Sequence, residues 1–531
     1  MTRPDTTGAA GRAAVVIGGG IAGLATAALL ARDGYSVDLL EQGDRLGGRI
    51  GSWESDGFRF DTGPSWYLMP EVFDHFFELF GRSAADELGL TVLDPGYRVF
   101  FEGEAEPVDI RSRVEDNLAT FERLEPGAGA RLEEYLASAT DAYELALRRF
   151  LYSNFDGLSG QLRWDVLARA PRLLRLLTQS LESYAASRFT DRRLTQILGY
   201  PAVFLGTSPD RAPSMYHLMS RLDLADGVRY PQGGFVRLVE AVAGLARAGG
   251  ARLHTGARVT EIATRPGPRR GRACVSGVRY VDEAGTERCL EADVVVGAVD
   301  LHHLETALLP ADLRTYPQDY WDARDPGPGA VLACLGVRGA VPELPHHSLF
   351  FTEDWGANFE AIFGAAPQVP EPASVYVCKP SATDPTVAPP GHENLFLLVP
   401  VPADVSLGRG GVRGTGDPQV ESVADAALDQ VAAWAGAPDL RERVVVRRTF
   451  GPGDFAADLN AWRGGALGPA HTLRQSAFLR TGNVSQKVSG LYFAGASTVP
   501  GVGLPMCLIS AELVAKRLRG DRSALPLEVP A

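Results

Sequence analysis

The sequence predicts an α/β protein whose first element is a buried strand of a Rossmann-like parallel sheet. Residues 13–17 form a short apolar run that leads, through glycines, into an Ala- and Leu-rich helix at 21–33. Gly34 stops that helix, and a second apolar run follows at 36–40. Short apolar runs of this kind are typical of parallel strands buried on both faces, and the order strand, helix, strand makes one βαβ unit.

Length and composition limit both the organisation of the chain and its partners. With 531 residues, 45% of them hydrophobic, the chain is too long for one compact core, so we expect two or three domains. A formal net charge of -13 disfavours a nucleic-acid partner, because phosphate contacts need a basic surface. The five cysteines are widely spaced and form no CxxC pair, which argues against a disulfide framework or a zinc site. The spacing of the nine histidines, which we expect at the surface or in the core, indicates no metal site either.

The uncharged stretch from Ala13 to Ala31 resembles a membrane span or a signal peptide in hydropathy alone. We interpret it as strand, turn and helix, because it contains four glycines and its apolar pattern changes period midway. We find no other candidate span, so we expect a protein that is not integral to a membrane.

The turn of the βαβ unit carries the first motif that implies chemistry. It reads Gly18-Gly19-Gly20-Ile21-Ala22-Gly23, which is G-x-G-x-x-G between a strand and a helix. Gly18 allows the tight turn, Gly20 lets the backbone approach a pyrophosphate, and Gly23 lets the helix pack closely on the strand. The helix N-terminus presents free N–H groups to the phosphates. Glu41 ends the second strand, where an acidic residue binds ribose hydroxyls, so a dinucleotide site is predicted.

The segment that follows Glu41 distinguishes between the possible dinucleotides. It reads Gln42-Gly43-Asp44-Arg45-Leu46-Gly47-Gly48-Arg49. The paired glycines free the backbone to fold over an anion, and the arginine beside them can donate charge-assisted hydrogen bonds. This segment resembles the G-G-R motif of the FAD-dependent amine oxidase and phytoene desaturase superfamily, in which it helps to hold the pyrophosphate. The resemblance implies FAD rather than NAD.

A third segment, from Gly57 to Pro64, looks like the part of that superfamily that runs past the flavin. Gly63 and Pro64 suit a stiff turn close to a flat ring. For Asp61 two interpretations stay open, a role beside the flavin and a role as a turn cap.

The C-terminal region contains a fourth motif. A strand at 491–494 runs into a Gly- and Pro-rich loop, Gly495 to Met506, and a helix follows from Cys507 to Arg519. The N-terminus of that helix can oppose negative charge that develops on reduced flavin. In the superfamily this arrangement closes the flavin site.

These motifs lie at both ends of the chain, and the segments at 230–234 and 292–296 match the same pattern. The whole chain therefore resembles bacterial phytoene desaturases of the carotenoid/retinoid oxidoreductase family, and 61–70 and the C-terminal PGVGLPMCLISAE look like the actinobacterial type. The resemblance implies FAD as the only redox cofactor and phytoene, a long acyclic polyene, as the substrate. The residues it assigns to FAD are Gly18, Gly20, Ile21, Ala22, Gly23, Glu41, Gln42, Gly48, Arg49, Gly63, Pro64, Val259, Gly495, Ala496, Gly503, Leu504, Pro505 and Met506.

The expected fold class is α/β: a Rossmann-like FAD-binding domain of the GR2 type, an inserted mixed α+β substrate domain and a helical lid or membrane-facing region. The discontinuous FAD-binding domain is expected at 1–110, 226–300 and 471–531. Residues 111–225, where Leu, Tyr and Phe recur at helical spacing, are expected to form the helical region, and residues 301–470 the substrate domain. Within the latter, five glycines at 408–416 indicate a flexible insert.

Desaturation removes a hydride to the flavin and a proton from the neighbouring carbon, so the protein must supply chiefly a dry channel and alignment. The polyene itself stabilises developing positive charge, which lessens the need for a strong base. Asp165 matches the acidic member of the family's polar pair near the substrate, whereas Ala168 falls where the family has Arg, with Arg169 one position later. We hypothesise that Asp165 assists proton transfer; the alternative is a helix N-cap or a solvated charge.

A polyene substrate resides in membranes, and the run from Arg163 to Leu181 offers a route to it. It combines four arginines with the leucines at 173, 174, 176, 177 and 181, as in a basic amphipathic helix that lies in the bilayer interface. The alternative is a helix that packs its leucine face over the substrate tunnel. We expect a cytoplasmic protein, peripherally associated with the cytoplasmic face of the membrane, with quinone or oxygen as electron acceptor.

Other functions stay open. One is another carotenoid flavoenzyme, either a dehydrogenase of an acyclic xanthophyll or an isomerase. A second is an amine or protoporphyrinogen oxidase, for which the sequence shows no recognisable aromatic cage. A third is a flavin-free protein similar to the GDP-dissociation inhibitors, against which the intact glycine motifs argue.

Overall fold

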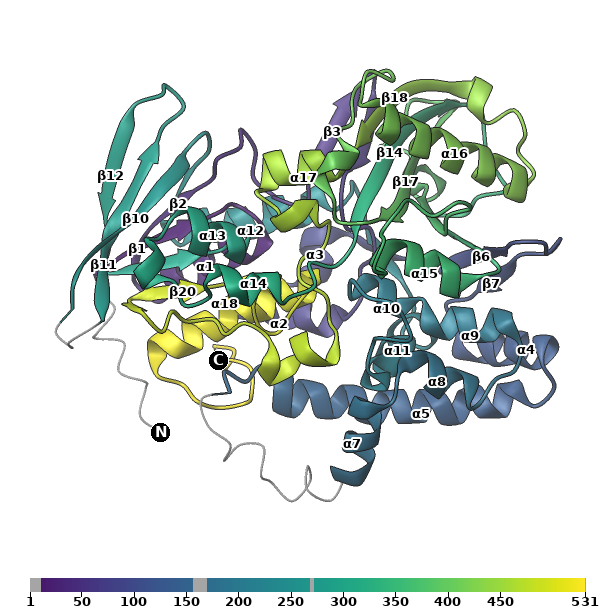
Figure 1. Cartoon of the computed structure of the whole chain (residues 1–531), viewed down its shortest axis with the longest axis horizontal. Coiled ribbons are helices and arrows are strands. Elements are labelled where there is room, and N and C mark those ends of the chain that lie inside the picture. The colour runs from purple at the N-terminus through teal and green to yellow at the C-terminus, as the bar shows by residue number, and fades with distance from the viewer. Residues whose placement is uncertain (1–10, 156–169, 268–271, 531) are drawn as a thin grey trace.

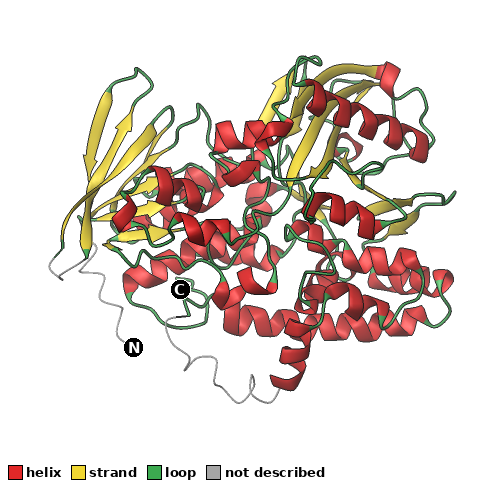
Figure 2. Ribbon diagram, in the orientation of Figure 1, coloured by secondary structure: helices red, strands yellow, loops and turns green. Residues whose placement is uncertain are grey.

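The computed structural model describes residues 11–155, 170–267 and 272–530 (Figure 1). Its strands form two separate groups, at the left and at the upper right of Figure 2. A set of helices gathers below the right-hand group. The first group contains the N-terminal unit, and the second is built largely from the middle of the chain.

The first sheet is parallel and begins with the predicted βαβ unit, β1 (Ala13–Ile17), α1 (Ile21–Arg32) and β2 (Ser36–Leu40). Strands from distant parts of the chain complete it in the order β20-β13-β1-β2-β9. These strands are β9 (Arg252–His254), β13 (Val294–Gly297) and β20 (Leu491–Phe493). The Rossmann-like parallel sheet predicted from the sequence is confirmed.

Helix α1 is enclosed on its outer side by two helices, α12 (Val236–Ala248) and α18 (Leu504–Arg519). Every residue of α1 from Ile21 to Ala31 is buried, because the helix is apolar all round and has neighbours on each side. Its N-terminus, at the carboxyl edge of the sheet, is therefore held by packing. An antiparallel extension lies beyond the sheet: β10 (Arg258–Pro266), β11 (Ala273–Val281) and β12 (Glu287–Glu291), with β19 (Val488–Ser489) paired to β11.

The second sheet has seven strands in the order β18-β14-β17-β16-β15-β6-β7, and α16 (Pro418–Ala435) packs on β14, β17 and β18. Two of its strands, β6 and β7, lie within the range 1–110 assigned to the FAD-binding domain. They belong to this sheet because β6 pairs in parallel with β15. The strands are β6 (Tyr97–Phe101), β7 (Val108–Ile110), β14 (Gly329–Arg338), β15 (His347–Phe351), β16 (Val375–Cys378), β17 (His392–Val401) and β18 (Val444–Phe450).

The helical region lies below the second sheet in Figure 1. Among the described residues, no helix is long and apolar enough to span a membrane. Its helices are α4 (Val114–Leu124), α5 (Ala128–Ala146), α7 (Ala170–Thr178), α8 (Leu181–Ala186), α9 (Arg192–Gly199), α10 (Pro201–Phe204) and α11 (Met219–Leu224).

Shorter elements connect these parts. The hairpin β3–β4 follows the first βαβ unit, and β5 pairs with β8 beside it. Their bounds are β3 (Ser52–Ser55), β4 (Phe58–Asp61), α2 (Pro70–Glu78), α3 (Ala84–Leu88), β5 (Leu90–Val92), β8 (Arg229–Pro231), α13 (Leu301–Ala307), α14 (Gln318–Asp322), α15 (Trp355–Phe363) and α17 (Pro452–Leu459).

The glycine-rich run at 408–416 is packed against β18, which differs from the flexible insert that its composition indicates. The Thr449 amide donates to Gly411 O at 2.9 Å, and the Arg413 amide donates to Arg447 O at 2.9 Å. A Cβ on Gly410 would lie 2.0 Å from Thr449 O. Glycine is therefore needed at 410 for close approach of two backbones rather than for mobility.

Candidate flavin and substrate site

The glycine turn between β1 and α1 has room for no side chain at two of its positions. The Gly18 amide donates to Leu40 O at 2.8 Å, and Gly18 has a φ of +103°. A Cβ on Gly23 would lie 2.0 Å from Gly18 O. The geometry thus fits the roles expected from the motif, a tight turn at Gly18 and close helix–strand packing at Gly23.

The N-terminus of α1 opens toward a cradle made of backbone. Gly20 is its N-cap, without a side-chain cap, and the first turn holds no acidic residue. The Gly47 amide donates to Gly19 O at 2.9 Å, and Gly48, with a φ of +56°, brings its own backbone against Gly20. Two glycine segments therefore face each other at a helix terminus of partial positive charge, an arrangement that fits a diphosphate.

The carboxylate of Glu41 lies at the same edge of the sheet. Its Oε2 accepts the Gly19 amide at 2.6 Å, and its Oε1 accepts the Gly43 amide at 2.8 Å. The Ala257 amide donates to Glu41 O at 2.8 Å, which brings the start of β10, with buried Val259, next to this residue. The acidic residue is thus placed one residue beyond β2, where a ribose would lie beside the cradle.

The side chain of Gln42 serves the fold. Its Nε2 donates to Asp458 O at 2.7 Å, and its Oε1 accepts Asn460 Nδ2 at 3.0 Å. Both partners belong to α17 or the residue after it, so only the backbone of Gln42 is left to contact a cofactor.

The segments around Arg49 and Gly63 touch each other directly. A Cβ on Gly63 would lie 1.8 Å from Arg49 O, so only glycine fits there. Arg49 Nε donates to Ala466 O at 2.9 Å. Pro64 follows, and Ser65 Oγ lies 2.5 Å from the hydroxyl of Tyr376 in β16, so this segment runs from the cradle to the second sheet.

The C-terminal loop meets the cradle from the other side. Gly495 has a φ of +108°, and its amide donates to Ser510 Oγ at 3.0 Å. A Cβ on Gly495 would lie 3.5 Å from the Cβ of Ala22 in the first turn of α1. Helix α18 then begins after Gly503 without a side-chain cap. Gly495 therefore lies against the first turn of α1, with Ala496 next in the chain, and Leu504, Pro505 and Met506 form the first turn of α18.

The comparisons with known proteins agree with this geometry. A family model described as "Flavin containing amine oxidoreductase" matches residues 21–519. The chain belongs to this family. FAD is accordingly its cofactor, and the backbone cradle, the uncapped helix termini and Glu41 are the groups of this oxidoreductase that would hold it.

Relatives place the oxidoreductase more closely, and a solved structure shares its fold. It is 41% identical over 511 residues to a protein named carotenoid 3,4-desaturase from Haloarcula japonica, with 96% of this chain and 99% of that protein covered. It is 36% identical to a zeta-carotene-forming phytoene desaturase from Myxococcus xanthus, with 96% and 94% covered. Cyclohexylamine oxidase from Brevibacterium oxydans superposes with a TM-score of 0.56 at 15% identity, covering 96% and 99%. At that identity the superposition shows the fold alone.

An aromatic wall begins two residues after Pro64. The ring of Trp66 lies 5.3 Å from that of Tyr97 and 5.4 Å from that of Phe204, and it stacks on His347 at 4.6 Å. Trp66 and Phe204 are only partly buried. Tyr97 and His347 are buried behind them, so the oxidoreductase has a cluster of aromatic rings here, with Trp66 and Phe204 partly exposed, next to the segment expected to pass the flavin. Sequence reasoning missed this wall because its residues come from separate elements.

A buried carboxylate supports the wall from behind. Oδ2 of Asp223 accepts the hydroxyl of Tyr97 at 2.8 Å and that of Tyr200 at 2.6 Å. Burial raises the pKa of Asp223 to about 6, against the opposing effect of the two hydroxyls. Asp223 thus orients two rings of the wall, and nothing in its local sequence predicts this role.

Asp61 acts as a helix cap across the chain. Its Oδ2 accepts the amide of Phe235, the residue before α12, at 2.8 Å. The residue is partly exposed, but Oδ1 is buried and has no hydrogen-bond partner among the described residues. Burial raises the pKa of this carboxyl to about 6. The structure therefore favours the capping interpretation of Asp61, with α12 rather than a local turn as the capped element.

Two neighbouring histidines lie in the core beside Cys378. The ring nitrogens of His346 and His347 and the Cys378 sulfur lie within 4.8 Å of one another, and all three residues are buried. Burial lowers the pKa of both imidazoles and raises that of the thiol to about 12. The group is therefore neutral, and Tyr376 ties it to the wall through a 2.8 Å hydrogen bond with His347 Nδ1. Core histidines were expected, but not this grouping.

The proposed acid/base residue, Asp165, lies outside the described residues, as do Arg163, Ala168 and Arg169. From Ala170 onward the expected amphipathic run is α7, in which Leu176 is buried and Leu174 is 63% exposed. Part of the leucine face therefore packs inward, and part faces solvent.

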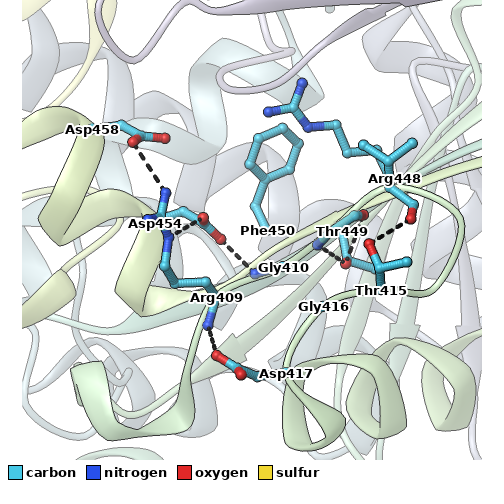
Figure 3. A pocket seen from close by; sticks show the side chains of 12 residues that line it. Arg409, Gly410, Thr415, Gly416, Asp417, Arg448, Thr449, Phe450, Asp454 and Asp458 are labelled. Atoms are coloured by element: carbon cyan, nitrogen blue, oxygen red, sulfur yellow. Dashed lines mark hydrogen bonds and ion pairs between the residues drawn. The ribbon is translucent and has the colours of Figure 1, made fainter.

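A surface hollow of about 430 Å³ lies on the second sheet, between the glycine-rich run and α17 (Figure 3). Arg409 joins its two sides, because its Nε donates to Asp454 at 3.0 Å and its amide donates to Asp417 at 2.6 Å. The hollow is polar and ion-paired, so it does not suit an apolar substrate.

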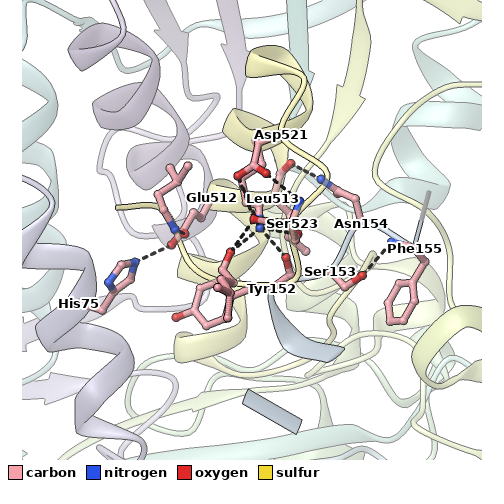
Figure 4. A network of polar contacts seen from close by, with 12 residues as sticks. His75, Tyr152, Ser153, Asn154, Phe155, Glu512, Leu513, Asp521 and Ser523 are labelled. Carbon is pink, nitrogen blue, oxygen red and sulfur yellow. Dashed lines mark hydrogen bonds and ion pairs between the residues drawn. The ribbon is translucent and has the colours of Figure 1, made fainter. Parts of the chain in front are cut away.

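The C-terminal half of α18 binds two other segments, residues 152–154 and the C-terminal tail, through polar contacts (Figure 4). Lys516 is fully buried, and its Nζ donates to the carbonyls of Tyr152 and Ser523, each at 2.8 Å. Glu512 contacts His75 Nε2 at 3.1 Å. One helix thus begins beside the cradle and ends in a polar network that holds the C-terminal tail and the segment at 152–154.

Proposed function

We propose that this oxidoreductase is an FAD-dependent carotenoid desaturase that acts on CH–CH bonds and converts phytoene toward lycopene. The observation that carries the proposal is the aromatic wall around Trp66, next to the flavin-passing segment. Carotenoid desaturases among the relatives, at 41% and 36% identity over nearly the whole chain, support the substrate class. An apolar polyene suits such a wall, because its burial needs no hydrogen-bonding partner.

Bound FAD would supply the hydride acceptor. The protein's own residues would do three things: the cradle would hold the diphosphate, the uncapped N-terminus of α18 would oppose developing negative charge, and the wall would exclude water and align the polyene. Asp165 is proposed to take up the proton. An Asp165→Asn variant with full FAD content and unchanged desaturation would exclude that role.

The proposal is tested by anaerobic incubation of the FAD-loaded protein with phytoene in liposomes, with and without a quinone. We expect bleaching of the flavin and a red polyene product, with turnover restored by quinone or by oxygen. A flavin that stays oxidised with phytoene would refute the phytoene assignment.

A second candidate is 3,4-desaturation of another acyclic carotenoid, favoured by the name of the 41% identical relative. The two are separated by offering phytoene and lycopene in parallel. Flavin reduction by lycopene and not by phytoene would favour the second candidate. Peroxide release with amines and no reaction with either polyene would point to an amine oxidase.

Peripheral membrane contact at the cytoplasmic face is part of the proposal. Leu174 of α7 is 63% exposed and Phe478 is 69% exposed, with arginines 175 and 474 exposed beside them. Helix α7 and the segment that carries Phe478 are linked through the helical turn at 214–218. Ser214 Oγ donates to Leu176 O, and Tyr216 OH donates to Ser476 Oγ, each at 3.1 Å. Apolar side chains flanked by arginines suit an anionic bilayer.

Flotation with anionic vesicles tests this contact. We expect the protein to float and a Phe478→Asp variant to float markedly less. Val405, which is 49% exposed elsewhere, offers the matched control Val405→Asp, which should float normally. If both the wild type and the control stay at the bottom of the gradient, membrane contact is contradicted.

A further inference from the structure

A buried arginine lies directly behind the C-terminal loop of the flavin site. Arg480 is 7% exposed, and its guanidinium donates to four backbone carbonyls. Nη2 reaches Ala496 O at 2.5 Å, and Nε reaches Thr498 O at 3.1 Å. Nη1 reaches Gln475 O at 3.1 Å and Pro469 O at 3.2 Å. Ala496 and Thr498 belong to the loop that meets the first turn of α1.

Arg480 has no carboxylate within ion-pair distance in the described part of the chain. Buried charges are usually paired, because removing an ion from water costs several kcal/mol and neutral carbonyls offset only part of that cost. Burial lowers the pKa of Arg480 to about 10, so the side chain remains a cation at neutral pH. The fold therefore maintains an uncompensated positive charge at this point.

The ionisable groups around Arg480 do not neutralise it. His471 is buried and its pKa is far below the usual value, so its ring is neutral; Nε2 accepts the Val502 amide at 3.1 Å. The pKa values of Tyr216 and Tyr320 are raised by burial, so both hydroxyls keep their protons. Among the described residues, the charge of Arg480 is therefore not offset by an ionised partner.

We propose that Arg480 is an electrostatic positioning residue: its charge, one peptide layer behind the loop at 495–498, stabilises the negative charge that the flavin gains on reduction. Gain of a hydride adds one unit of negative charge to FAD. Fixed cations next to developing negative charge in a water-excluded site favour the charged state without reorganisation. Arg480 would thereby raise the midpoint potential of the bound flavin and make the oxidoreductase a stronger oxidant. This inference rests on FAD as the cofactor and not on the identity of the substrate.

The test measures the midpoint potential of bound FAD anaerobically, against reference dyes and without any carotenoid. Arg480→Met should shift the equilibrium against reduction at least tenfold, a change of about 30 mV to more negative potential for a two-electron couple. Arg480→Lys, which keeps the charge but cannot form the same hydrogen bonds, should stay close to the wild type. Arg338→Met, an exposed arginine at the end of β14, is the control and should leave the midpoint potential unchanged.

Equal potentials in the wild type and Arg480→Met, or equal shifts in the Met and Lys variants, would overturn the proposal, because the role would then be only structural. The wild type gives a second test should the variants lose flavin. If the cation keeps reduced FAD anionic, the potential should change by about 30 mV per pH unit between pH 5.5 and 6.5. A slope of about 59 mV per pH unit, which means two protons for two electrons, would refute it.

Discussion

The two ends of the flavin site differ in composition, because one consists of backbone groups and the other of side chains. The diphosphate cradle is made of backbone from two glycine segments, at 18–23 and 47–48, that lie close together in the sequence. The end proposed for the flavin ring consists of side chains from separate elements: Trp66 and Tyr97 with Asp223 behind them, and Arg480 behind the C-terminal loop. The cradle therefore recognises charge through fixed N–H groups, and the wall offers shape and apolar surface.

This difference predicts that the two ends respond differently to mutation. A bulkier side chain in the cradle collides with backbone that cannot move aside, so flavin binding should fail outright. A smaller side chain in the wall removes contacts, and flavin should remain bound. The predictions below test this separation.

The largest effect is expected for Gly23→Val in the cradle. The added Cβ would lie 2.0 Å from Gly18 O, so α1 must move off β1 and its N-terminus must leave the cradle. We expect purified protein without the yellow flavin spectrum. Gly244→Ala is the control, since a Cβ in the middle of α12 would meet nothing within 4 Å; it should keep the flavin and gain about 0.5–1 kcal/mol of stability.

Trp66→Ala should separate the two ends most clearly. Loss of the ring opens the wall, and turnover of the carotenoid should fall about a hundredfold, which corresponds to about 3 kcal/mol of transition-state stabilisation. Flavin content, measured by the ratio of visible to ultraviolet absorbance, should equal that of the wild type. Loss of flavin together with turnover would contradict the separation.

The pH dependence of unfolding should report Asp223 behind the wall. Burial raises its pKa from the ordinary value near 3.8 to about 6 in the folded protein, so the folded state favours the protonated form. This contribution to stability is complete below about pH 4 and is lost as the pH rises through about 6, to an extent of up to about 3 kcal/mol. Denaturant titrations from pH 4 to 7.5 should show the decrease in the wild type and a smaller one in Asp223→Asn. Identical profiles would contradict the shifted pKa.

The smallest effect is expected for Glu41→Gln. The neutral amide can still accept the Gly19 amide, but it loses the charge that strengthens hydrogen bonds at the edge of the sheet. We expect about a tenfold rise in the Kd for FAD, near 1.4 kcal/mol, by fluorescence titration of the apoprotein. Glu54→Gln, an exposed residue paired with Arg59, should leave the Kd unchanged.

The sequence by itself determined the cradle: the turn at Gly18 and Gly23, the acidic residue at 41, the second glycine pair and the C-terminal loop. Its requirements are local, because a positive φ or a close backbone approach leaves glycine as the residue that fits. Such a constraint is written at one position and can be recognised without knowing what lies opposite.

Only the tertiary structure decided the aromatic wall, the cap that Asp61 provides for α12, the packing of the glycine-rich run at 408–416 and the cation at Arg480. Each depends on what surrounds a side chain rather than on the side chain itself. Tyr97 and Asp223 are 126 positions apart, and the buried Arg480 is accommodated by four carbonyls from two stretches of the chain, 469–475 and 496–498. Burial and partners are set by packing over long sequence distances, and they decide whether an ionisable group is a solvated surface charge or part of a site.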